Sequence, residues 1–126
     1  MTSDELAKGL QQALEDKKAL NIHVLDLRGR SSFTDYFILA TGTSDTHLRA
    51  LAQEMDRYAS VNGGTVLGVE GLMQAEWILV DLEDVVVHLF RKEVREFYDL
   101  EKLWADPVEQ LNAMRDMMAK GATGSK

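Results

Sequence analysis

The sequence predicts an α/β fold, in which a mixed β-sheet of about five strands is flanked by helices. Two long helical patterns, at 2–19 and 44–62, alternate with short runs rich in Val, Ile and Leu. Two of these runs, 76–81 and 84–90, follow each other directly, as the strands of an antiparallel hairpin do. Because a helix also separates two of the strands, a helical crossover and therefore a parallel pair are expected.

The first helix is expected over residues 2–19. Thr2 and Glu5 fit a capping box, in which each side chain bonds to the backbone N–H of the other residue. One apolar stripe, which would face a core, follows from the spacing of Leu6, Leu10, Ala13 and Leu14. The next strand is expected over 22–27, with a polar loop after it at 28–32.

The second strand is expected over 35–41. Its side chains are apolar on both faces, which favours a central position in the sheet. Gly42-Thr43-Ser44 ends this strand, and Ser44 or Asp45 caps the second helix. Asn62-Gly63-Gly64 ends that helix, and a short third strand is expected at 65–69.

The hairpin at 76–90 places two large polar-edged side chains near each other. If Leu82-Glu83 forms the corner, Trp77 lies directly opposite His88. Opposed residues share a face of the sheet, so these two are expected to be neighbours. A short helix is then expected over 93–98.

Composition limits the classes of partner. The 126 residues suffice for one domain with its own core, and the formal net charge is −7. No basic face is present, and an acidic protein repels phosphate, so direct binding of nucleic acid is not expected. There is no cysteine, no secretory signal and no apolar run long enough for a membrane span, which favours a cytoplasmic protein.

The catalytic and metal motifs are weak. Gly42-Thr43-Ser44 opens a helix and could hold an anion, but a strand-to-helix turn with a Ser cap is the commoner use of such residues. His23, His47 and His88 are not spaced as a metal pair, and no hydrolase motif occurs. We therefore expect no catalytic residue, metal or cofactor.

Several separated motifs carry a family resemblance. They are DVVVHLF at 84–90, REFYDLEKLW at 95–104, TDYF at 34–37, ATGTS at 40–44, His47 and VEG at 69–71. In this order and spacing they resemble the Iojap family, the bacterial ribosomal silencing factors, over about residues 6–104. The family domain is accordingly assigned to 1–104. Residues 105–126 are interpreted as a C-terminal extension, with a helix starting at Asp106-Pro107 and a frayed tail.

The resemblance implies a nucleotidyltransferase-like fold and a function without catalysis. It implies that the protein binds the large ribosomal subunit through the fourteenth large-subunit ribosomal protein, at the subunit interface. Small-subunit joining would be blocked, and translation repressed under nutrient limitation. The implied partner-binding residues are Trp77, Leu82, His88 and Tyr98. It also implies a homodimer, with which the apolar residues Tyr36, Phe37, Leu100, Leu103 and Trp104 are compatible.

The sequence also leaves an alternative function open and departs from the family pattern at one position. An alternative is a nucleotidyltransferase-like enzyme that uses Ser44, Asp81 and Glu83 for nucleotide and metal. The hairpin corner also departs from the family pattern D-x-G-D, because Glu83 occupies the position of the glycine. Glycine suits a positive φ that glutamate resists, so either the turn differs or Glu83 is strained.

Overall fold

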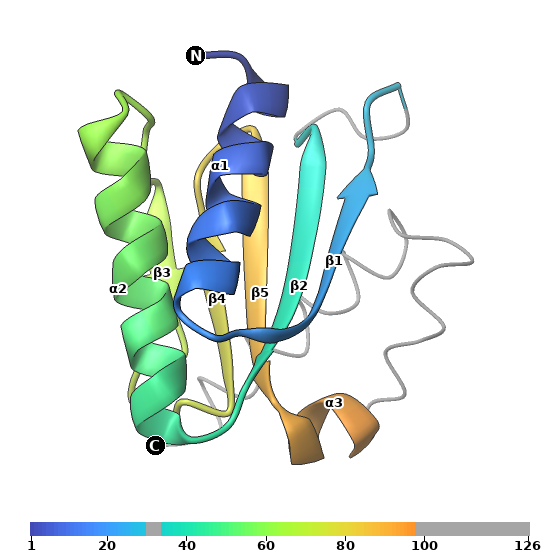
Figure 1. Ribbon diagram of the computed structural model, residues 1–126, viewed down its shortest axis with the longest axis vertical. Coiled ribbons are helices and arrows are strands. Elements are labelled where there is room, and N and C mark those ends of the chain that lie inside the picture. Colours follow the sequence, from blue (N-terminus) through green and yellow to red (C-terminus); the bar gives the residue numbers. More distant parts are fainter. Residues whose placement is uncertain (30–33, 98–126) are drawn as a thin grey trace.

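The computed structural model describes residues 1–29 and 34–97 (Figure 1). The elements in chain order are α1 (Ser3–Asp16), β1 (Leu20–Asp26), β2 (Tyr36–Gly42), α2 (Asp45–Val61), β3 (Gly68–Glu70), β4 (Trp77–Asp81), β5 (Val85–Arg91) and α3 (Lys92–Phe97). The expected helix at Asp106 lies outside the described residues, as does Tyr98.

The five strands form one mixed sheet in the order β1-β2-β5-β4-β3. The pair of β2 with β5 is parallel, and the other three pairs are antiparallel. Every residue of β2 is buried, as expected for a central strand. The predicted fold class is therefore confirmed, and the crossover between β2 and β5 contains α2.

Helices α1 and α2 lie side by side on one face of the sheet (Figure 1). The apolar stripe of each helix packs against residues from the central strands, including Ile38, Ala40, Ile78, Val80, Val87 and Leu89. The two helices approach closely where Gly9 of α1 faces the ring of Tyr58. A Cβ at Gly9 would collide with that ring.

The helix ends follow the predicted chemistry. Both halves of the capping box of Thr2 and Glu5 are formed, and the Ser44 hydroxyl caps α2. The first helix ends at Asp16, three residues earlier than expected, and Lys18 takes a left-handed φ of +67° in the turn that follows. The third strand is also shorter than expected, because it begins only at Gly68.

The opposite face of the sheet is also apolar and buried. Alternation along the strands assigns to it Phe37, Leu39, Trp77, Leu79, Val86, His88 and Phe90. We call these seven residues the aromatic face. Leu25 and Val94 pack against its margin.

Candidate partner-binding site

The hairpin of β4 and β5 brings Trp77 and His88 into contact on the aromatic face. The indole N–H of Trp77 donates a hydrogen bond to Nδ1 of His88, with an N–N distance of 3.0 Å. Only 8% of Trp77 is exposed, and His88 is 0% exposed. The prediction that these residues are neighbours on one face is confirmed.

The register of the hairpin differs from the prediction. Trp77 lies opposite Phe90, and His88 lies opposite Leu79. Trp77 and His88 are therefore diagonal neighbours, displaced by two residues along the face. Large aromatic side chains still meet across such a diagonal.

The difference in register arises at the corner. The Leu82 N–H donates to the Val85 carbonyl over 2.9 Å, so the two corner residues are Glu83 and Asp84. Glu83 has a φ of +74°, and its N–H donates to a carboxylate oxygen of Asp81 over 3.1 Å. Glutamate thus adopts here the backbone conformation that favours glycine. The second expectation, a strained Glu83, is correct.

The same corner is fastened to the start of β2. The Asp84 carbonyl accepts hydrogen bonds from the backbone N–H groups of Asp35 at 2.8 Å and Tyr36 at 3.1 Å, and from the Thr34 hydroxyl at 3.0 Å. The TDYF motif therefore aligns the central strand with the hairpin corner. This is a structural role for a motif first noticed only as part of the resemblance.

Aromatic rings surround His88. The ring of Phe37 meets the imidazole edge-on, with centroids 4.4 Å apart, and Phe90 is stacked at 6.1 Å. Because Nδ1 accepts the Trp77 hydrogen bond, the ring proton of neutral His88 is assigned to Nε2. Contacts with Trp77, Phe37 and Phe90 therefore fix the orientation of the imidazole.

The structure does not gather all the sequence-derived site residues. Leu82 is 1% exposed and packs in the core beneath α1 and α2, on the other side of the sheet from Trp77 and His88. Tyr98 lies outside the described residues. Tyr36 and Phe37, which were compatible with a dimer contact, are buried within the chain.

The residues of the alternative enzyme site are far apart. Ser44 follows the end of β2, whereas Asp81 is level with Phe37 near the start of β2. At about 3.3 Å per residue, the length of β2 separates them by roughly 17 Å. Ser44, Asp81 and Glu83 therefore do not form one site.

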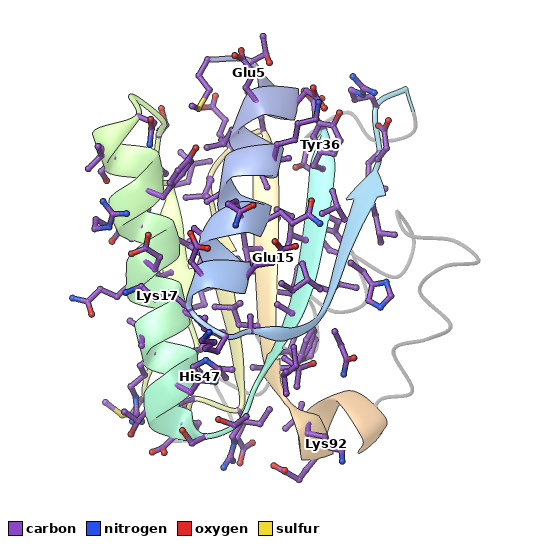
Figure 2. The ribbon with its side chains drawn as sticks, in the orientation of Figure 1. Glu5, Glu15, Lys17, Tyr36, His47 and Lys92 are labelled. Carbon is purple, nitrogen blue, oxygen red and sulfur yellow. The ribbon has the colours of Figure 1, made fainter. Side chains whose placement is uncertain are left out.

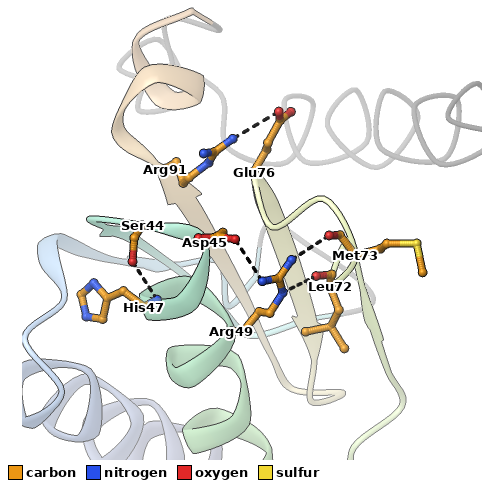
Figure 3. A network of polar contacts seen from close by, with 8 residues as sticks. All are labelled: Ser44, Asp45, His47, Arg49, Leu72, Met73, Glu76 and Arg91. Carbon is orange, nitrogen blue, oxygen red and sulfur yellow. Dashed lines mark hydrogen bonds and ion pairs between the residues drawn. The ribbon is translucent and has the colours of Figure 1, made fainter.

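The turn before α2 uses its donors internally. The Ser44 hydroxyl accepts from the His47 N–H over 3.0 Å, as Figure 3 shows, and the Thr43 N–H donates to Nδ1 of His47 over 3.0 Å. The other ring nitrogen of His47 lies 2.8 Å from the Lys17 carbonyl, at the end of α1 (Figure 2). His47 is therefore a hydrogen-bonded structural residue that joins the start of α2 to the end of α1.

The described part of the chain comprises residues 1–29 and 34–97. This part of the chain contains no group of three or more His, Cys, Asp or Glu side chains that could hold a metal ion. None of its helices is long and apolar enough to cross a membrane.

A polar network at the other end of the sheet was not predicted. Arg49 of α2 donates to the backbone carbonyls of Leu72 at 2.9 Å and Met73 at 2.8 Å, and pairs with Asp45 at 3.1 Å (Figure 3). The pKa of Asp45 lies below its usual value, chiefly because the Thr46 N–H donates to it and also because of Arg49. Backbone acceptors leave no pattern in a sequence, so this contact had no detectable signal.

The sequence matches a family of known proteins. The family model described as "Ribosomal silencing factor during starvation" matches residues 1–125. The ribosomal silencing factor RsfS of Bacillus subtilis is 44% identical over 106 residues, which cover 84% of this chain and 90% of that protein. An Arabidopsis thaliana protein named Iojap-related, mitochondrial, is 30% identical over 76% of this chain and 54% of its own length.

Solved structures share the fold. A crystal structure from Chromobacterium violaceum has a TM-score of 0.78 and 39% identity, covering 83% of this chain and 88% of that one. A second, from Bacillus halodurans, has a TM-score of 0.72 and 40% identity, covering 80% and 94%. The five-stranded sheet and its motifs define an α/β protein of the Iojap-related class. More narrowly, the chain belongs to the ribosomal silencing factor family.

Proposed function

We propose that this protein binds the large ribosomal subunit at its subunit interface and thereby prevents the small subunit from joining. Family membership is the observation that carries this proposal. A mouse relative, 34% identical over 75% of this chain, is named for assembly of the ribosomal large subunit, which supports the large subunit as the target. Translation would fall during starvation, as the family description implies.

Charge supports a basic protein as the direct partner. The net charge is −7, and residues 58–90 contain five acids and no Lys or Arg. These residues include the whole of β3, β4 and most of β5. Most of β4 and β5 is buried, but four of these acids are exposed, namely Glu70, Glu76, Glu83 and Asp84, and they attract a basic protein and repel bare RNA. The partner we propose is the fourteenth large-subunit ribosomal protein, with no sequence-specific contact to nucleic acid.

Trp77, Leu82, His88 and Tyr98 are the residues on which we propose that binding depends. Trp77 and His88 fix each other through their hydrogen bond, and Leu82 anchors the hairpin in the core. Their burial supports a role in setting the shape of the hairpin rather than in offering exposed area. The activity consists of occupancy and steric competition, so it requires no cofactor and breaks no bond.

Two further proposals follow from the same function. Because the target is the ribosome, the protein acts in the cytoplasm. It also forms a homodimer when free, and light scattering of the purified chain tests this directly. A monomeric mass at micromolar concentration would contradict the dimer without affecting ribosome binding.

Co-sedimentation with purified large subunits tests the central proposal. We expect the wild-type chain to sediment with large subunits at physiological salt, and to reduce their joining to small subunits in proportion to occupancy. Trp77→Ala and Tyr98→Ala should each weaken binding by about 2 kcal/mol, the loss expected at positions on which an interface depends. Circular dichroism verifies that the variants are folded. A wild-type chain that stays in the supernatant would refute the function.

A further inference from the structure

Two exposed apolar side chains stand out on the described surface. Met73 is 85% exposed and Leu72 is 44% exposed, and both belong to the turn between β3 and β4. Single exposed apolar residues are ordinary, but two in succession on a structured turn expose a contiguous apolar area. We call residues 71–75 the apolar turn.

The apolar turn has a defined backbone. The Ala75 N–H donates to the Gly71 carbonyl over 3.0 Å, which closes a single helical turn. Gly71 has a φ of +87° and Ala75 a φ of +52°. A Cβ at Gly71 would collide with the Trp77 carbonyl oxygen, so the turn is seated directly on the start of β4.

Arg49 holds the turn from the opposite side. Its guanidinium takes the carbonyls of Leu72 and Met73 together, and its remaining ion pair with Asp45 directs it toward them (Figure 3). Both backbones are thereby drawn toward α2, and the Met73 side chain points away from Arg49 in this view. The Arg49 guanidinium thus fixes the backbone that carries the exposed side chains of Leu72 and Met73.

The charges around the turn indicate the kind of partner. Glu70 and Glu76 flank it and are both exposed, and Glu76 also forms an ion pair with Arg91 over 3.2 Å. Segment 67–76 itself contains no Lys or Arg. A second copy docked turn to turn would bring its own Glu70 and Glu76 against these same acids, which disfavours this turn as the contact of a homodimer. A basic protein surface with an apolar recess matches both features.

We propose that the apolar turn is a direct contact with a basic ribosomal protein, and that Arg49 is the residue that positions it. This inference rests on the proposed function and identifies a binding element within it. Leu72 and Met73 supply the apolar area that enters the partner. Glu70 and Glu76 face its Lys or Arg residues. The Trp77 carbonyl lies close against Gly71, and the Trp77 side chain belongs to the aromatic face, so this residue connects the turn to that face.

Affinity for purified large subunits tests the proposal. The double variant Leu72→Ser with Met73→Ser removes the apolar area without adding charge, and we expect it to bind at least roughly tenfold more weakly. The matched control is Val61→Ser, since Val61 is 69% exposed but lies at the far end of α2. The control should bind as the wild type does.

The outcomes separate the two proposals. If the wild type and the double variant bind equally, the apolar turn is not the contact, and the proposed function stands. If the double variant loses self-association but keeps ribosome affinity, the occupant is a second copy, and the inference is wrong. If the wild type itself does not bind large subunits, the proposed function is refuted and the inference is refuted with it.

A double-mutant cycle tests the role of Arg49. Arg49→Ala should weaken binding several-fold in the wild-type background and have almost no effect in the double variant, because Arg49 acts only through the turn. Equal losses in both backgrounds would show that Arg49 supports the fold in general and does not position the turn.

Discussion

The indole N–H of Trp77 and Nδ1 of His88 are 3.0 Å apart, although the hairpin places neither residue opposite the other. The hydrogen bond therefore runs diagonally between β4 and β5 and links two different pairs of opposed residues, Trp77 with Phe90 and Leu79 with His88. It satisfies two polar groups in a face that is otherwise apolar. Buried groups of this kind are costly once a partner is removed.

Trp77→Phe tests this pair. Phenylalanine keeps an aromatic ring but removes the donor, so Nδ1 of His88 loses its buried partner. We expect a loss of about 1–3 kcal/mol in the free energy of unfolding, measured by urea denaturation. The control is Phe90→Leu, which alters packing on the same face without removing a donor. If Trp77→Phe in a His88→Phe background costs as much as in the wild type, the hydrogen bond is not the cause.

Glu83→Gly should stabilise the protein. Glu83 has a φ of +74°, which glycine adopts without the steric strain of a side chain. Glycine also increases the entropy of the unfolded chain, so we expect a net gain of roughly 0.5–1 kcal/mol. Glu83→Ala is the control, because alanine removes the charge and keeps the strain. A gain in both variants would assign the effect to charge.

Gly71→Ala should be more damaging than Gly29→Ala. Both glycines have a φ near +80°, at +87° and +80°, but only Gly71 would place a Cβ against backbone atoms. We expect about 1 kcal/mol for the strain at Gly29 and more than about 2 kcal/mol at Gly71. Thermal unfolding of both variants provides the comparison. Similar losses of stability in the two variants would mean that the backbone at 71–75 moves to accept the new Cβ at little cost.

The capping box predicts a dependence on pH. The pKa of Glu5 lies below its usual value, first because the Thr2 N–H donates to it and then because of the Thr2 hydroxyl. A lowered pKa stabilises the fold above the ordinary value, about 4.3, and this contribution is lost as the pH falls through the folded-state pKa. The wild type should therefore exceed Glu5→Gln in stability at pH 7 but not at pH 2. A difference that is constant with pH would contradict this.

Sequence patterns predicted the elements well because their causes are local. The alternation of apolar residues determined which side chains share a face, and cap residues located the start of each long helix. The register of the β4–β5 hairpin was wrong because it depends on a single backbone angle at Glu83, a residue type that rarely adopts it.

The site was less predictable than the fold. The proximity of Trp77 and His88 followed from the pairing of two adjacent strands, whereas the Arg49 contact joins α2 to carbonyls more than twenty residues away. The burial of the aromatic face could not be predicted from the sequence either. An aromatic patch and an aromatic core have the same alternation in sequence, and only the structure shows that His88 is fully covered.

The parallel pair at the centre of the sheet has a consequence for biosynthesis. Tyr36 pairs with Val85 and Gly42 with Arg91, so each residue of β2 pairs with a residue of β5 that is synthesised 49 positions later. At about 5–20 residues per second, a nascent chain carries the apolar β2 without that neighbour for several seconds. During that interval β1 can pair with one edge of β2, and α1 and α2 can cover one face, but the edge that β5 will occupy stays open. Completion of the sheet is therefore governed by the synthesis of β5, and truncation before Arg91 would leave a chain prone to aggregate.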